Sequence, residues 1–181
     1  GWVLDSQTGI KTCDDLTAVL TNYVQHFMSN VGNKFTTIEV LNELANPNAL
    51  GLNVLSPCIK QVGPIEWGKK WLNIARSANP NAKLLINDAH TPFNGEDFPR
   101  ILDGLVDNNG KPLYDIIGLQ SHMYGGPLWS LDVIWNGLEF YSKYKVPLYS
   151  TEVTVLSGTP MDIFPWGKET TPQGERKQAE Y

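Results

Sequence analysis

The sequence has few cysteines, few histidines and no long apolar run. Its 181 residues include 2 cysteines, Cys13 and Cys58, and 3 histidines. The cysteines match no metal spacing, and one possible disulfide between them neither makes a disulfide-built scaffold nor identifies a redox compartment. No two histidines stand four residues apart and no Cys-His cluster occurs, so we expect no metal site. No apolar run approaches the ~18 residues of a membrane span, so we expect no membrane partner.

Positive charge is also scarce. Lys and Arg number 14 against 19 for Asp and Glu, which leaves a net charge of −5. Nucleic acids and anionic membranes bind basic patches, so this balance argues against both partners and leaves a neutral polymer open. The sequence lacks a glycine-rich phosphate loop and a Gly-x-Ser-x-Gly elbow, and neither cysteine lies at a predicted strand end. Nucleotide binding, serine hydrolysis and thiol catalysis are therefore not favoured.

Helical and strand-like segments alternate along the chain, of which 41% is apolar. Apolar residues at helical spacing predict a helix capped by Asp14-Asp15, and further helices over about 65–78 and 131–145. They also predict a helix from about Glu96 that closes at Asn108-Asn109-Gly110. Short apolar runs predict strands over 35–41, 83–86, 115–120 and 146–151, with a loop over 47–63. This alternation predicts an α/β fold with a parallel sheet, either doubly wound or a barrel. An eight-unit barrel needs about 250 residues, so four βα units make about half of one.

Polar side chains stand at the end of every predicted strand. They are Asn42-Glu43, Asn87-Asp88, Gln120 with His122, and Glu152. A single carboxylate at such a place is most often a helix cap or a loop salt bridge. In sheets of this class, however, chemistry lies at the C-terminal ends of the strands, so four polar ends in succession indicate a functional site.

Two carboxylates at one edge of a sheet suit glycoside hydrolysis. One of them, kept protonated by an apolar or anionic setting, protonates the leaving oxygen, while the other attacks the anomeric carbon or activates water. Glu43 and Glu152 end separate strands, so folding can bring them together. Their separation, and hence retention or inversion of configuration, stays open at this point.

Three further residues accompany these carboxylates. We expect His122 to hydrogen-bond a strand-end glutamate, with a bond to a loop carbonyl as the alternative. Tyr124 and Trp129 lie in the loop after the third strand, where flat aromatic rings suit the apolar faces of sugars. Packing within the loop explains these two aromatics equally well.

Four motifs in order resemble glycoside hydrolase family 10, the xylanase family of retaining β/α-barrel enzymes. They are IEVLNE at 38–43, AKLLIND at 82–88, IIGLQSH at 116–122 and TEVT at 151–154. Their order and spacing agree with strands four to seven of that barrel, and the resemblance covers nearly the whole chain from Leu16 onward. It implies that residues 1–181 form a partial (β/α)8 TIM barrel, a fragment of a catalytic domain.

The resemblance also implies roles for individual residues. Glu43 would be the general acid/base and Glu152 the nucleophile that forms a glycosyl-enzyme intermediate. The remaining implied substrate-site residues are Asn42, Asn87, Gln120 and His122, of which Asn87 has the weaker role. His122 and Gln120 would hold the nucleophile and the sugar. The family's chemistry needs no metal or organic cofactor.

The sequence departs from the family pattern in two places. Ile38-Glu39 stands where the family usually has Trp-Asp, which changes the packing beneath the acid/base. Thr154 stands where the family usually has an Asp that orients the histidine. Thr154 is an uncharged partner, so the charge state of His122 and the fine substrate preference are open.

We therefore expect an endo-β-1,4-xylanase-like retaining glycoside hydrolase whose partner is xylan of the plant cell wall. A polymeric substrate implies a secreted or periplasmic location. The alternatives are a glucanase of the same clan and a non-catalytic sugar-binding relic of the barrel. Half a barrel has two unpaired strand edges, so we expect the isolated chain to be poorly soluble, self-associated or inactive.

Overall fold

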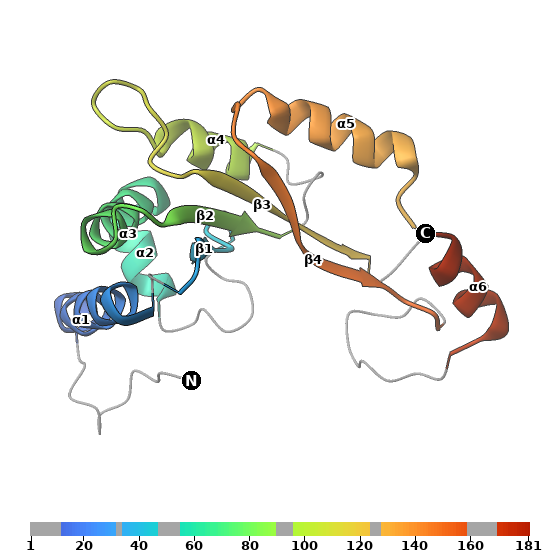
Figure 1. The fold of residues 1–181 in the computed structure, drawn as a ribbon, viewed down its shortest axis with the longest axis horizontal. Helices are drawn as coiled ribbons and strands as arrows, with labels where there is room; N and C mark the ends of the chain where they lie inside the picture. Colours follow the sequence, from blue (N-terminus) through green and yellow to red (C-terminus); the bar gives the residue numbers. More distant parts are fainter. Residues whose placement is uncertain (1–11, 32–33, 47–54, 90–95, 124–127, 159–169) are drawn as a thin grey trace. The chain divides into compact units, whose positions relative to one another are not determined.

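Helices and strands alternate in the computed structural model, which describes residues 12–31, 34–46, 55–89, 96–123, 128–158 and 170–181 (Figure 1). The elements in chain order are α1 (Cys13–Val31), β1 (Thr37–Asn42), α2 (Ser56–Val62), α3 (Pro64–Ala78), β2 (Lys83–Asp88), α4 (Asp97–Gly104), β3 (Ile116–Met123), α5 (Leu131–Ser142), β4 (Leu148–Val155) and α6 (Pro172–Glu180). The strands follow one another in the sheet in the order β1-β2-β3-β4, and β1 pairs with β2 in parallel. This pattern confirms the predicted α/β class with four βα units.

The chain forms two compact units. Unit 1 contains Gly1–Asp88 and Gly95–Ile117, and unit 2 contains Ala89–Asn94 and Gly118–Tyr181. Strand β3 therefore begins in unit 1 and continues in unit 2. None of the helices within the described ranges is long and apolar enough to cross a membrane.

Several predicted boundaries were wrong. Helix α2 occupies part of the expected loop, because Pro57 lies in the first helical turn, where its missing N–H costs nothing. Helix α4 ends at Gly104 rather than at Asn108-Asn109-Gly110, since Val106 pairs with Pro112 in an antiparallel bridge. Strands β3 and β4 run further than predicted, so His122 and Glu152 lie within them.

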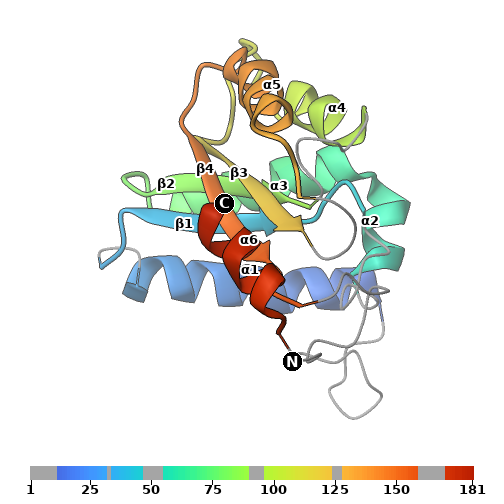
Figure 2. The same cartoon turned by 90° about the vertical axis from the view of Figure 1, so that its right-hand side faces the viewer.

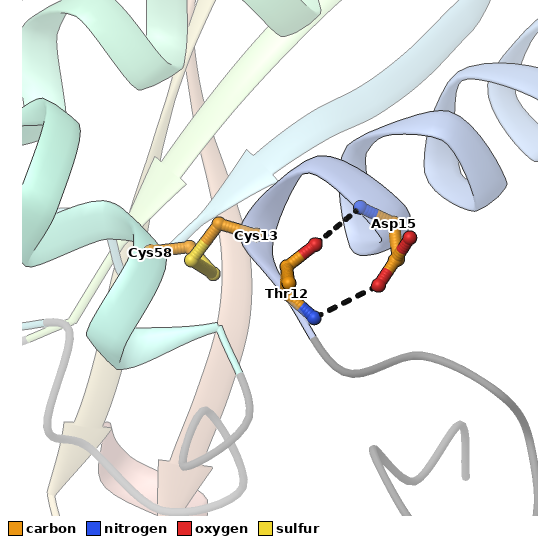
Figure 3. The surroundings of a disulfide bond; sticks show 4 residues. All are labelled: Thr12, Cys13, Asp15 and Cys58. Carbon is orange, nitrogen blue, oxygen red and sulfur yellow. Dashed lines mark hydrogen bonds between the residues drawn. A yellow bond between two sulfur atoms is a disulfide. The ribbon is translucent and has the colours of Figure 1, made fainter.

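The start of α1 is capped by Thr12 rather than by Asp14-Asp15 (Figure 3). The Thr12 hydroxyl accepts a hydrogen bond from the Asp15 amide at 3.1 Å, and the Thr12 amide donates to the Asp15 carboxylate at 3.0 Å. This reciprocal pair satisfies two of the amides that a helix start leaves without partners. Figure 2 shows the full length of this helix, which buries Leu16 and Met28.

The core of unit 1 lies between β2 and α3. Strand β2 is buried from Leu84 to Asp88, as expected of a parallel strand covered on both faces. Helix α3 buries Trp67 and Trp71, the two tryptophans predicted to be core residues. At Gly68 a Cβ would lie 2.7 Å from a Leu105 methyl, so this glycine allows close packing of α3.

Asp115 connects the N-terminal ends of β2 and β3. It accepts hydrogen bonds from the Leu84 amide at 2.9 Å and from the Arg76 guanidinium, and Lys83 lies 3.8 Å away. Burial alone would raise the pKa of Asp115, but these hydrogen bonds and the two positive charges outweigh it and lower the pKa below its ordinary value. The carboxylate is therefore stabilised in its ionised form.

A disulfide joins Cys13 of α1 to Cys58 of α2 within unit 1 (Figure 3). The two Cα atoms are 5.5 Å apart, within the ordinary range for a bridged pair. The bond closes a loop with a sequence separation of 45 residues. Loop closure of this length removes conformational freedom from the unfolded chain, which is worth about 4 kcal/mol in the chain-entropy description.

Breaking this disulfide should lower the free energy of unfolding by about 2–4 kcal/mol. Urea unfolding of the chain with and without a thiol reductant measures the difference. A variant with Cys13→Ser and Cys58→Ser is the control, since its unfolding should not respond to the reductant. Equal stability of the oxidised and reduced chains would contradict the prediction.

Replacing Asp115 by Asn should lower the free energy of unfolding by about 1–3 kcal/mol at neutral pH, because charge-assisted hydrogen bonds are lost. A lowered folded-state pKa gives stability that is present above the unfolded value of about 3.9 and is lost as pH falls below it. The difference in free energy of unfolding between wild type and variant, measured by urea unfolding, should therefore become smaller below about pH 4. The exposed ion-pair residue Asp97 supplies the control, since Asp97→Asn should change stability by less than about 1 kcal/mol.

Candidate functional site

Strand β1 contains a β-bulge that sets the direction of the following side chains. Glu39 pairs with Leu85 and Leu41 pairs with Ile86, so the intervening Val40 is the extra residue. The bulge shifts the two-residue alternation by one position, which allows both Ile38 and Leu41 to be buried. It also places Asn42 opposite Asn87 in the register.

Glu43 follows the strand in a left-handed backbone conformation with φ of 53°. A non-glycine residue adopts this region rarely, at a cost of order 1 kcal/mol, and such residues concentrate at functional sites. Its amide donates a hydrogen bond to the carbonyl of Asn87 at 3.0 Å. Leu41 and Leu44 on either side are buried, and both have side-chain atoms near Gly68 of α3. Packing on both sides therefore holds Glu43 in its unusual conformation.

Two polar residues at the end of β2 support the residues around Glu43. The Asn87 side-chain amide donates to the Asn42 side-chain oxygen at 3.1 Å. Asp88 accepts a hydrogen bond from the amide of Ala45 at 2.9 Å. Asn87 and Asp88 are fully buried, whereas Asn42 is exposed. In this placement Asn42 can reach a ligand, and Asn87 acts as its support.

In unit 2, His122 lies between two side chains of β4. Its Nε2 is 2.9 Å from Oε2 of Glu152, and its Nδ1 is 2.7 Å from Oγ1 of Thr154. The His122 side chain is 19% exposed and the Glu152 side chain 39% exposed. The histidine thus forms the expected hydrogen bond to a glutamate, while the carboxylate remains within reach of a ligand.

The other face of these two strands lines an apolar cavity of about 340 Å³ under α5. Ser121 and Met123 of β3 line this cavity, so by strand alternation His122 points to the opposite face. Trp129 also lines the cavity, and the structure therefore does not bring it together with His122 and Glu152. A sugar-binding role for Trp129 stays a prediction.

The remaining predicted residues have different outcomes. Gln120 is only 2% exposed, on the same face of β3 as His122 by alternation. Tyr124 lies outside the described residues. Across the ranges that the structure describes, no three metal-ligating side chains gather into a group.

Sequence reasoning missed the bulge at Val40 and the anchoring role of Asp88. Neither has a clear local signal, because Val40 is a good strand residue and Asp88 looks like one more polar strand end. The position of Asp88 at the end of β2, two residues after the apolar run Leu84-Leu85-Ile86, is the only hint of its burial.

Helices alternating with the strands of one sheet, of which β1 and β2 pair in parallel, define a partial (β/α)8 barrel. The chain belongs to glycosyl hydrolase family 10, whose family model matches residues 1–180. This confirms the family that the four sequence motifs indicated.

Solved structures with the same fold include xylanases. A family 10 protein from Paenibacillus barcinonensis has a TM-score of 0.68 and 22% identity, covering 94% of this chain and 50% of that one. Xylanase 10B from Thermotoga petrophila, solved with xylobiose, has a TM-score of 0.64 and 26% identity over 81% of this chain and 44% of that one. Xylanase B from Clostridium stercorarium has a TM-score of 0.68 and 21% identity, with coverages of 92% and 49%. The chain therefore spans about half the length of the structures that it matches.

Replacing Asp88 by Ala should lower the free energy of unfolding by about 1–3 kcal/mol, because the amide of Ala45 loses its acceptor. Asp88→Asn is the matched variant, since its side-chain oxygen can still accept that hydrogen bond. Urea unfolding of both variants gives the comparison. Equal losses in the two variants would show that the hydrogen bond to Ala45 does not matter for stability.

Proposed function

We propose that this chain supplies the acid/base and the nucleophile of a retaining endo-β-1,4-xylanase. The observation that carries the proposal is the hydrogen bond from His122 to a half-exposed Glu152. A nucleophilic carboxylate has to be oriented and also open to its substrate, and this arrangement meets both needs. Membership of family 10 supports the reaction class.

In the first step, Glu43 donates its proton to the glycosidic oxygen while a carboxylate oxygen of Glu152 attacks the anomeric carbon. The bond between that carbon and the leaving oxygen breaks, and the shortened chain departs as an alcohol. The product on the protein is a glycosyl ester of Glu152. Glu43 is left as a carboxylate.

In the second step, Glu43 accepts a proton from water as the water oxygen attacks the same carbon. The ester bond breaks and Glu152 regains its negative charge. Two inversions give net retention. The fixed donor at Glu152, the His122 N–H, costs no reorganisation as this charge disappears and returns.

The left-handed conformation of Glu43 supports its assignment as the acid/base. Two buried leucines, the bond to Asn87 and the anchor at Asp88 together maintain a backbone that Glu does not favour. Residues held in disfavoured backbone conformations cluster at functional sites. The exposed Asn42 beside it is suited to binding a sugar hydroxyl.

Xylan is the proposed substrate, and the xylobiose complex of the Thermotoga petrophila protein supports a xylose-based ligand. A glucanase of the same clan is the second candidate, favoured only by the departures at Ile38-Glu39 and Thr154. A secreted or periplasmic location is proposed as well. The Cys13–Cys58 disulfide supports it, because such bonds persist in oxidising compartments.

The test uses the full-length gene product that contains this chain and compares Glu152→Gln with Glu43→Gln. Glu152→Gln should abolish turnover of xylan and of an aryl xylobioside with a good leaving group. Glu43→Gln should slow xylan hydrolysis by about 10²–10⁴-fold, but should slow the first step on the aryl substrate far less, since that leaving group needs no proton.

Glu139→Gln, an exposed position on α5, is the control and should leave both rates unchanged within about twofold. A parent protein without xylan turnover would support the sugar-binding relic instead. Faster hydrolysis of β-glucan than of xylan would support the glucanase.

A further inference from the structure

Both ring nitrogens of His122 have an oxygen partner on β4, and these two partners differ in chemistry. Nε2 faces the Glu152 carboxylate at 2.9 Å, and Nδ1 faces the Thr154 hydroxyl at 2.7 Å. An ionised carboxylate can only accept a hydrogen bond, whereas a hydroxyl can donate or accept. This asymmetry decides where the ring carries its proton.

The number of protons on the His122 ring follows from the charge of Glu152, which is ionised when it acts as a nucleophile. An ionised Glu152 requires an N–H at Nε2, which donates to it. A neutral imidazole has one N–H, so Nδ1 is then an acceptor. The Thr154 hydroxyl, 2.7 Å away, can supply the matching O–H. Both contacts are then satisfied without any charge on His122.

We propose that Thr154 is a positioning residue that makes His122 an uncharged hydrogen-bond donor to Glu152, by donating its own hydroxyl proton to Nδ1. The consequence for rate depends on the proposed function. The position of the ring proton requires only that Glu152 is ionised, and it can be measured without turnover.

The usual family residue at this position would have the opposite effect. An Asp carboxylate accepts and cannot donate, so it requires an N–H at Nδ1. His122 could then keep its bond to Glu152 only as a doubly protonated cation. Thr154 thus replaces a charged carboxylate–imidazolium–carboxylate arrangement by one with a single charge, on Glu152.

An uncharged donor has a specific advantage for a two-step reaction. The Nε2–H can donate to the Glu152 carboxylate before attack and to the ester oxygen afterwards, with no proton transfer between the two states. A neutral donor also withdraws less charge from the attacking carboxylate than an imidazolium does. The nucleophile is therefore oriented without being neutralised.

The direct test is ¹⁵N NMR of the histidine-labelled full-length gene product at about pH 8, where an ordinary imidazole is neutral. Signals of His122 are assigned by their loss in His122→Gln. The proposal predicts a proton on Nε2 alone in the wild type and in Thr154→Ser. In Thr154→Asp both ring nitrogens should be protonated at the same pH.

A wild-type ring protonated on Nδ1, or on both nitrogens, would overturn the proposal. So would a Thr154→Asp ring that stays singly protonated. These results need no turnover, so they are independent of the outcome for the xylanase reaction.

A kinetic comparison tests the positioning role. Thr154→Val has nearly the same shape but no hydroxyl, so kcat should fall about tenfold with KM changed less than about twofold. Thr154→Ser keeps the donor and should retain most of the wild-type kcat. An unchanged kcat in Thr154→Val, or an equal loss in Thr154→Ser, would contradict a role for the hydroxyl.

Discussion

A carboxylate that attacks a sugar has to stay ionised, keep one orientation and remain open to its substrate, and these needs conflict. Burial orients a side chain but disfavours its charge, while full exposure leaves it mobile. In this chain a partly buried histidine holds one oxygen of Glu152, and the carboxylate remains 39% exposed. The histidine is in turn held by Thr154, so the neighbouring strands β3 and β4 supply the whole arrangement.

In unit 1 the backbone fixes the position of Glu43. Glu43 lies in a backbone region that glutamate disfavours, and the bulge at Val40 brings the chain to that point with Asn42 opposite Asn87. The buried carboxylate of Asp88 then holds the amide of Ala45, just after Glu43. Strain at the predicted acid/base is thus sustained by contacts from a different strand, which is how a fixed conformation persists against its cost.

Much of the fold could be predicted from the sequence, because the alternation of apolar segments reflects the repeated βα unit. The strand ends also identified Glu43 and Glu152 as candidates, and the hydrogen bond from His122 to a glutamate is present as expected. The bulge could not be predicted, since it depends on the register between β1 and β2. Helix α2 was missed because Pro57 and Gly63 look like loop residues, although both suit the ends of a short helix.

The face of the sheet on which a loop aromatic lies could not be predicted from its place in the sequence. Trp129 follows a glycine-rich segment near His122, yet it lines the cavity on the opposite face of β3. Whether a loop residue faces the site or the helix layer depends on tertiary packing, which carries no periodic signal. The Cys13–Cys58 bond was undecided for the same reason, since only the folded positions of α1 and α2 bring the two residues together.

Glu152 is the proposed nucleophile of a retaining glycoside hydrolase, and the rest of the mechanism depends on this role. Intact mass of the full-length gene product after incubation with an activated 2-fluoro-xylobioside, followed by peptide mapping, tests it most directly. The fluorine slows the second step, so a retaining enzyme keeps the sugar on its nucleophile. One adduct per chain, located on Glu152, is expected. A xylan-hydrolysing protein that gains no adduct, or carries it on another residue, would show that Glu152 is not the nucleophile.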